Sequence, residues 1–304
     1  MTLRTTTISV AAASFGRDME QSYATIAENI ELARQRGSSL LVLPEACLGG
    51  YLPSLGGGDE SEEKRQRRLQ NLPPALEVDG PEIARVAAMA GDMVVTFGFC
   101  EADGPARYNA AVTLHGDGIL GSYRKVHQPL GENLCYSPGS TYRAFDTPVG
   151  RMGMQICYDK AFPEAAREIA LDGAEIITSL SAWPTSRTGR APNMADDRWK
   201  HRFDIYDQAR ALENQVIWVA SNQAGSFGSL DFVCSSKIVG PGGEVLAGTG
   251  VEPGLATATV DVQGAIAAAR GGGMYNLRDR RPSVYGTITD QDSMSRVDRV
   301  MSRA

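Results

Sequence analysis

Short apolar runs alternate with stretches of helical periodicity along almost the whole of this chain. The run SLLVLP at residues 39–44 follows a predicted helix at 19–36, whose apolar residues recur at helical spacing and which Gly37 ends. A wholly apolar run after a helix indicates a buried strand in a sheet that helices cover. Because this alternation returns through the chain, the sequence predicts one layered α/β domain with a mixed sheet or sheets and helices outside.

The other predicted elements follow from the same patterns. Further helices are expected at 81–90, 163–172 and 198–214, and segment 51–77 is expected to be a loop with one short, charged helix. The polar tail is predicted to be an extension over residues 287–304, after a domain that spans residues 1–286. We predict strands at 7–13, 39–44, 93–99, 109–114, 119–124, 152–157, 176–180, 216–221 and 256–262, with a hairpin at 235–246.

Composition excludes several classes of protein. The formal net charge of -6 argues against a nucleic-acid or anionic-membrane partner, which would call for a basic face. The absence of a run of about eighteen apolar residues predicts no membrane span, and the first residues alternate like a strand rather than a signal peptide. The five cysteines are odd in number, widely spaced and without a CxxC pair, which argues against a disulfide framework and a zinc site. We therefore expect a cytoplasmic protein.

Cys157 is the first candidate for chemistry. It ends the apolar strand GRMGMQIC and precedes YDKAFPEAAREIA, which opens a helix. A nucleophile at a strand-to-helix turn is exposed at a sharp corner, and a helix N-terminus and a nearby cation stabilise a thiolate. The alternative is a small buried hydrophobe at a strand end, which is the common fate of a free cysteine.

No histidine offers the setting of a papain-type partner for this cysteine. One lies in a predicted hairpin turn, one inside a polar helix, and one two positions after a lysine at a strand end. A Cys–His protease is therefore a weak interpretation. The three histidines are His115, His127 and His201.

Charged residues at two other strand ends offer a different route. Glu45 directly follows SLLVLP, and a partly buried carboxylate there has its pKa raised toward the range of a general base. Lys125, in YRKVHQP, can lower the pKa of a thiol and meet a developing oxyanion. Glu132 is a second carboxylate near the same turn. Taken singly, a loop glutamate or a strand-end lysine is as well explained as a solvated surface group.

Taken together, these motifs resemble the carbon–nitrogen hydrolases of the nitrilase superfamily. That family places Glu, Lys and Cys in this order, each after a strand, and the matching segments here are LVLPEACLGGY, YRKVHQP and GMQICYDKAFPEAAR. The segments DQARALENQ and LRDRRPSVY are also similar to the family. The resemblance covers roughly residues 5–286, and three ordered motifs make it specific.

The resemblance implies a fold and a mechanism. The fold is a four-layer αββα sandwich, assembled as a homodimer or a larger homo-oligomer, with no cofactor or metal. Glu45 would take the thiol proton while Cys157 attacks the substrate carbon. Lys125 and the backbone N–H of Tyr158 would stabilise the oxyanion, and a thioester would then be hydrolysed. Glu132 would hold Lys125 and orient the amide nitrogen.

The residues after the nucleophile narrow the branch of the family. Nitrilases proper usually carry Trp-Glu after the cysteine, whereas this chain has Tyr158 and Asp159, which is more similar to amidases. D-Carbamoylases carry two arginines shortly after the cysteine to clamp the substrate carboxylate, whereas this chain has Lys160 and Ala161. We therefore expect a small linear amide as substrate, with an N-carbamoyl compound or a nitrile as the alternative for the same site. A catalytically inert scaffold would not need the intact Glu, Lys and Cys.

Substrate-binding residues are expected around the segment SLSAWPTSRTGRAPN, residues 179–193. In the family this region lines the pocket, so Trp183 is predicted to form an apolar wall. Arg187, or Arg190, is predicted to meet an acidic group of the substrate, with a solvated loop arginine as the alternative. Tyr51 is a further predicted pocket residue, and Phe227 is a weaker one.

Overall fold

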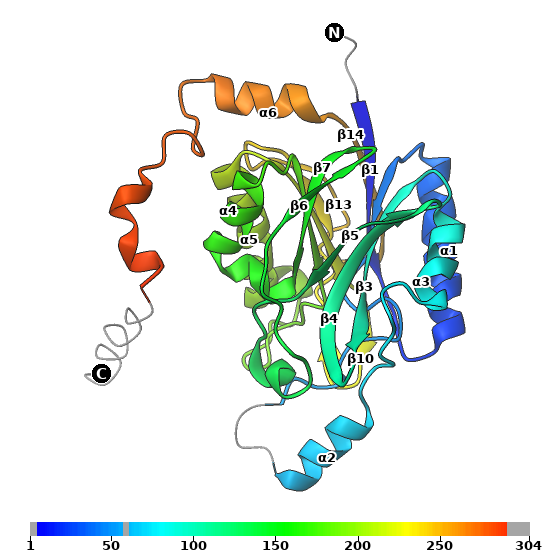
Figure 1. The fold of residues 1–304 in the computed structure, drawn as a ribbon. Coiled ribbons are helices and arrows are strands. Elements are labelled where there is room, and N and C mark those ends of the chain that lie inside the picture. Colours follow the sequence, from blue (N-terminus) through cyan, green and yellow to red (C-terminus); the bar gives the residue numbers. More distant parts are fainter. Residues whose placement is uncertain (1–4, 57–60, 291–304) are drawn as a thin grey trace, which may run out of the picture.

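The computed structural model describes residues 5–56 and 61–290, which contain six α-helices and one twelve-stranded ladder (Figure 1). The helices are α1 (Met19–Gln35), α2 (Glu62–Gln70), α3 (Pro81–Ala90), α4 (Pro163–Leu171), α5 (Arg198–Asn214) and α6 (Val262–Gly271). The strands of the ladder are β1 (Thr5–Ala13), β2 (Leu40–Val42), β3 (Val94–Asp103), β4 (Ala106–His115), β5 (Gly118–Arg124), β6 (Ala144–Thr147), β7 (Gly150–Ile156), β8 (Ile176–Ser181), β9 (Ile217–Gln223), β12 (Lys237–Val239), β13 (Val245–Gly248) and β14 (Gly254–Asp261). A separate small hairpin consists of β10 (Ser226–Phe227) and β11 (Leu230–Asp231).

The ladder folds into two facing layers. Its order is β5-β4-β3-β2-β1-β9-β8-β7-β6, with β14 paired to β1 and β12 paired to β9. The two halves meet where β1 pairs with β9, and across the molecule β3 contacts β8 and β4 contacts β7. The helices α1 and α3 cover the outside of one layer, and α4 and α5 cover the outside of the other (Figure 1). The predicted αββα sandwich is confirmed.

Parallel pairing explains why helices lie on both outer faces. The parallel pairs β1/β2, β2/β3, β7/β8 and β8/β9 each need a crossover connection. The helices α1, α3, α4 and α5 lie in those connections, and each packs back onto the layer from which its chain came. The consequence is that the ends of the parallel strands in both layers are free to carry loops with functional side chains.

Two apolar cores hold the layers together. The central core lies between the two sheets, where Val10 of β1 shares a cluster with Met154 of β7. The same cluster continues to the helix side of the second sheet, where Trp218 of β9 donates to Asp207 of α5. The second lies between the first sheet and its helices, and it includes Ile26 of α1 and Ile83 of α3. These side chains are at most 2% exposed. Burial of this completeness is worth about 1.5–3 kcal/mol for each large apolar side chain.

Most predicted elements are confirmed to within a few residues, whereas β6, α6 and the small hairpin of β10 and β11 were missed. The strand β6 is short and half-exposed, so its sequence shows no clear alternation. The helix α6 contains glycine near its start, where Asp261 caps it by accepting the Gly264 N–H at 3.0 Å. The strand β3 continues to Asp103 and pairs with β4, which makes a meander rather than the single predicted hairpin.

The predicted C-terminal extension lies largely outside the described residues, because residues 291–304 are not described. In the described part of the chain, no helix is both long enough and apolar enough to span a membrane.

Candidate active site

The three predicted motif residues come together where three strands end. Glu45 follows β2, Lys125 directly follows β5, and Cys157 directly follows β7. All three are buried: Glu45 and Lys125 have no exposed surface, and Cys157 is 4% exposed. Such burial of charged groups is costly unless they are paired, so the partners of each group decide what the cluster can do.

Lys125 lies between two buried carboxylates. Its Nζ is 2.9 Å from Glu45 Oε1 and 2.8 Å from Glu132 Oε2, and none of the three side chains is exposed. Burial alone would lower the pKa of Lys125, but the carboxylates of Glu132 and Glu45 outweigh burial and raise it above its ordinary value. Lys125 is therefore a fixed cation inside the protein.

Glu45 is held by both ends of its carboxylate. Oε1 accepts a hydrogen bond from Asn109 Nδ2 at 2.6 Å in addition to the one from Lys125, and Oε2 accepts the backbone N–H of Ala182 at 2.6 Å. The backbone of Glu45 also packs directly on β3, since a Cβ added to Gly98 would lie 2.8 Å from its Cα. These contacts leave the carboxylate one orientation and explain why glycine occupies position 98.

Glu132 lies in the 3-10 helix Leu130–Leu134 and faces the same lysine. Tyr51 donates its hydroxyl to Glu132 Oε1, and Asn109 Nδ2 reaches the same oxygen at 3.4 Å. Burial raises the pKa of Glu132 to about 7, although Lys125 acts in the opposite direction. Burial also raises the pKa of Tyr51 well above its ordinary value, which keeps its hydroxyl as a donor. The sequence indicated Glu132 and Tyr51, but it did not indicate that they are bonded to each other.

Cys157 occupies a strained corner. Its φ of 50° lies in the left-handed region, which residues other than glycine rarely adopt. It is the first residue of the 3-10 helix Cys157–Ala161, so the predicted strand-to-helix turn is confirmed. Burial raises the pKa of the thiol well above its ordinary value, Glu45 raises it further, and Lys125 opposes both. Burial and Glu45 therefore outweigh the stabilisation of a thiolate that was expected from the nearby cation.

Asp159 holds the turn at Cys157 in place through hydrogen bonds to both of its carboxylate oxygens. Its Oδ2 accepts the Tyr123 hydroxyl at 2.6 Å and the Ile156 backbone N–H at 3.1 Å. Its Oδ1 accepts the backbone N–H of His127 at 2.9 Å and the hydroxyl of Tyr142 at 3.0 Å. Asp159 thus ties the residue before Cys157 to the loop that follows Lys125. Asp159 was predicted only as a marker of the branch of the family, and nothing local in the sequence indicates these long-range contacts.

A second buried charge cluster, which was not predicted from the sequence, lies close to Cys157. Lys160 Nζ is 2.5 Å from Asp207 Oδ1, and Lys237 Nζ is 2.9 Å from Asp207 Oδ2. The two ammonium groups lie 3.6 Å and 4.3 Å from the centre of the Phe203 ring. Because Lys160 comes three residues after Cys157 in a 3-10 helix, the two side chains leave the same side of that helix. Long-range pairing of this kind has no local sequence signal.

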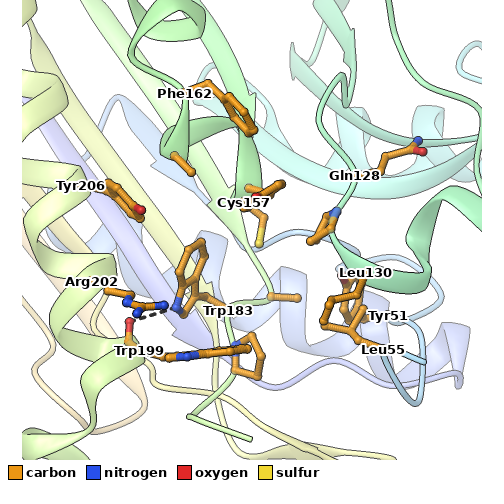
Figure 2. A pocket seen from close by; sticks show the side chains of 15 residues that line it. Tyr51, Leu55, Gln128, Leu130, Cys157, Phe162, Trp183, Trp199, Arg202 and Tyr206 are labelled. Carbon is orange, nitrogen blue, oxygen red and sulfur yellow. Dashed lines mark hydrogen bonds between the residues drawn. The ribbon is translucent and has the colours of Figure 1, made fainter. Parts of the chain in front are cut away.

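Cys157 opens into a cavity of about 580 Å³ (Figure 2). The predicted pocket residues Tyr51, Tyr158 and Trp183 line it. The prediction for Arg187 is not supported, because that side chain is exposed and lies outside the lining. The loop turns it outward, and α5 supplies Arg202 to the cavity instead.

The two weaker predictions for the pocket also lie outside the lining. Arg190 forms an ion pair with Asp231, and Phe227 belongs to the small hairpin next to it. The lining residues from α5 had a signal in the sequence: Trp199, Arg202 and Tyr206 recur at helical spacing in the predicted helix 198–214.

Comparison with known proteins identifies the class of enzyme. A sequence model of the carbon–nitrogen hydrolase family matches residues 7–270. The chain is similar to N-carbamoylputrescine amidase of Solanum tuberosum, with 30% identity over 95% of this chain and 97% of that one. It is also similar to a nitrilase of Pyrococcus abyssi, with 30% identity over 75% of this chain and 78% of that one.

The fold agrees with the sequence comparison. A carbon–nitrogen hydrolase from Helicobacter pylori superposes with a TM-score of 0.78, over 94% of this chain and 99% of that one, at 24% identity. This chain therefore belongs to the carbon–nitrogen hydrolase family, within the nitrilase superfamily. It is a hydrolase that acts on carbon–nitrogen bonds other than peptide bonds.

Proposed function

We propose that this protein is a thiol amidohydrolase that converts a linear amide and water into a carboxylic acid and ammonia. The observation that carries the proposal is the buried group of Glu45, Lys125 and Glu132 behind a cysteine that opens into a cavity. A protonated thiol next to a fixed carboxylate and a fixed ammonium is suited to acyl transfer, because it has a base for the proton and a cation for the oxyanion.

In the first half of the reaction, Glu45 takes the proton of the Cys157 thiol, and the sulfur attacks the amide carbon. The carbonyl oxygen becomes an oxyanion, which Lys125 and the backbone N–H of Tyr158 stabilise. This N–H lies in the first turn of its 3-10 helix, where no earlier carbonyl of the helix can accept it. Glu45 returns the proton to the nitrogen, and the carbon–nitrogen bond breaks. Ammonia departs, and a thioester between Cys157 and the acyl group remains.

In the second half, Glu45 takes a proton from water while the water oxygen attacks the thioester. The tetrahedral intermediate forms next to the same two donors, the carbon–sulfur bond breaks, and the proton goes back to the sulfur. Glu132 keeps Lys125 in place throughout and accepts a hydrogen bond from the amide N–H₂ of the substrate. The base thus works twice, and this role needs a carboxylate with one fixed orientation, as the contacts from Asn109 and Ala182 provide.

Hydrolysis of an N-carbamoyl compound is the second candidate for the same site. The similarity to N-carbamoylputrescine amidase supports it. A carbamoyl group presents the same carbonyl and the same N–H₂ to the site, so the two candidates differ in the group attached to the carbonyl. We also propose a cytoplasmic homo-oligomer. The cytoplasmic location is supported by the sequence composition, and the homo-oligomer by the resemblance to the family.

Ammonia release separates the candidates. We expect ammonia from linear amides, with a mass increase of Cys157 that corresponds to the acyl group when the reaction is quenched early. Carbon dioxide released together with ammonia from carbamoyl compounds would favour the second candidate. Ammonia from nitriles but not from amides would contradict the amidase proposal, and ammonia from none of these compounds would contradict both candidates.

A further inference from the structure

The cavity wall opposite Leu130 is formed by one face of α5 (Figure 2). Trp199, Arg202 and Tyr206 lie at positions i, i+3 and i+7 of this helix, so they share a face. The indole N–H of Trp183 donates to the backbone carbonyl of Trp199 at 3.0 Å, which fixes the ring of Trp183 next to Arg202. Arg202 is exposed to solvent, but a helix rather than a loop holds it in the cavity wall, among aromatic side chains.

Arg202 carries the one formal charge among the fifteen residues that line the cavity. Within residues 5–56 and 61–290, no carboxylate forms an ion pair with it, whereas nearby basic side chains are paired. Lys200 lies 2.7 Å from Asp204, and Arg190 pairs with Asp231. The positive charge of Arg202 is thus available to a ligand in the cavity.

The other lining residues indicate the size and polarity of the part of the ligand that lies between its reacting group and its charged group. Six of the lining residues are aromatic, namely Tyr51, Tyr158, Phe162, Trp183, Trp199 and Tyr206. A volume of about 580 Å³ falls in the usual range for pockets that bind ligands much larger than a two-carbon amide. Aromatic walls favour a flat, apolar body between the reacting carbonyl at Cys157 and the charge at Arg202.

Building on the proposed amidohydrolase function, we propose that the substrate is an amide with a broad apolar or aromatic body and a distal carboxylate, which Arg202 binds. A guanidinium matches a carboxylate with two parallel hydrogen bonds. The same charge disfavours a cationic substrate. N-Carbamoylputrescine, for which some relatives are named, ends in a primary amine that is protonated at neutral pH. We therefore expect this protein to hydrolyse N-carbamoylputrescine with a low kcat/KM.

A matched pair of amides tests the proposal. 4-Phenylbutanamide and 4-(4-carboxyphenyl)butanamide differ in one carboxylate, and 4-(4-aminomethylphenyl)butanamide carries an ammonium at that place. We expect kcat/KM for the acid to exceed that for the other two by about tenfold, which corresponds to about 1.4 kcal/mol. In Arg202→Gln the ratio of acid to uncharged amide falls toward 1, mainly through KM. Arg202→Lys keeps part of the ratio, because the charge remains while the planar fork is lost.

Arg198→Gln is the matched control. Arg198 lies in the same turn of α5, is exposed and donates to the carbonyl of Thr188 at 2.6 Å, outside the cavity lining. The substitution Arg198→Gln removes an equal charge from the same end of the helix but leaves the cavity unchanged. The ratio of kcat/KM for the acid to that for the uncharged amide should therefore stay as in the wild type. If wild type favours the uncharged or the ammonium amide, or if Arg202→Gln lowers kcat/KM equally for all three amides, the proposal is overturned.

Binding to Cys157→Ala keeps this test separate from the proposed reaction. Calorimetric Kd values for the acid and the uncharged amide should differ by about tenfold in Cys157→Ala and should converge in Cys157→Ala/Arg202→Gln. Equal affinity in Cys157→Ala contradicts the role of Arg202 even if amides are hydrolysed. Tighter binding of the acid without any turnover by the wild type supports Arg202 and contradicts the proposed amidohydrolase instead.

Discussion

The ammonium of Lys125 lies 2.9 Å from the carboxylate of Glu45, and neither side chain is exposed to solvent. Glu132 approaches the same ammonium from another element, at 2.8 Å. One buried ammonium group therefore neutralises part of the charge of two buried carboxylates. This arrangement makes the cluster electrostatically dependent on Lys125, whatever its part in the chemistry.

Replacing Lys125 should damage both stability and activity. In Lys125→Met two carboxylates remain buried without a counter-charge, so we expect a loss of about 3–5 kcal/mol in the free energy of unfolding at pH 8. The loss should be smaller at pH 5, because Glu132 can then take up a proton. Urea unfolding at the two pH values measures this difference. Lys64→Met, at an exposed position of α2, should change stability by no more than about 0.5 kcal/mol.

Removing the thiol of Cys157 should abolish turnover without unfolding the protein. Alanine lacks the nucleophile, so we expect Cys157→Ala to lower kcat for amide hydrolysis by at least about a thousandfold. The control is Cys234→Ala, since Cys234 is also buried but lies outside the cavity lining. Ammonia release measures the activity of both variants, and circular dichroism measures whether they are folded. Activity of Cys157→Ala near the wild-type level would exclude the thioester route.

The buried Glu132 should leave a signature in the pH dependence of stability. Its pKa in the folded protein is about 7, above the ordinary glutamate value of 4.5. The folded state therefore holds this proton more tightly than the unfolded state, and the resulting stability is present at low pH and is lost as pH rises from about 4.5 to 7. The contribution to the slope is at most about 1.4 kcal/mol per pH unit.

Glu132→Gln removes that contribution. We expect the stability of the variant, relative to wild type, to rise between pH 5 and pH 7.5 in urea unfolding measured at several pH values. Subtracting the wild-type curve cancels the titration of groups that the two proteins share. A difference that stays flat over this range, or that falls, would contradict the raised pKa.

The parts of the site that could be predicted are those set by local sequence. Glu45, Lys125 and Cys157 each follow a strand whose apolar run is visible in the sequence, and strand ends are where a layered α/β fold presents its loops. The strained corner at Cys157 follows from the same strand-to-helix pattern. Glu132 could be proposed because its motif resembles that of a known family.

The parts that could not be predicted depend on packing between distant segments. Asn109 of β4 reaches Glu45 across 64 positions of sequence, and Asp207 of α5 reaches Lys160 across 47. The packing of α5 likewise brings Arg202 to the cavity, where Arg187 or Arg190 had been predicted. Local periodicity places a side chain on a face of its own element, but it does not say which other element that face will meet.

The pairing of Lys160 with Asp207 predicts that removing the carboxylate destabilises the protein more than removing the lysine does. Asp207 accepts hydrogen bonds from Lys160, Lys237 and the indole N–H of Trp218. Asp207→Asn therefore leaves the buried ammonium of Lys160 without its carboxylate and leaves Lys237 with Asp204 alone. We expect that variant to lose about 3–5 kcal/mol in the free energy of unfolding.

Lys160→Met should cost less, about 1–2 kcal/mol, because Asp207 keeps Lys237 and Trp218 as partners. Burial already lowers the pKa of Lys160, and loss of Asp207 lowers it further. The penalty in Asp207→Asn should therefore shrink between pH 7 and pH 9.5, as the lysine gives up its proton. Urea unfolding of both variants and of the double variant at these two pH values tests the pairing. Losses that simply add in the double variant would show that the two side chains are not coupled.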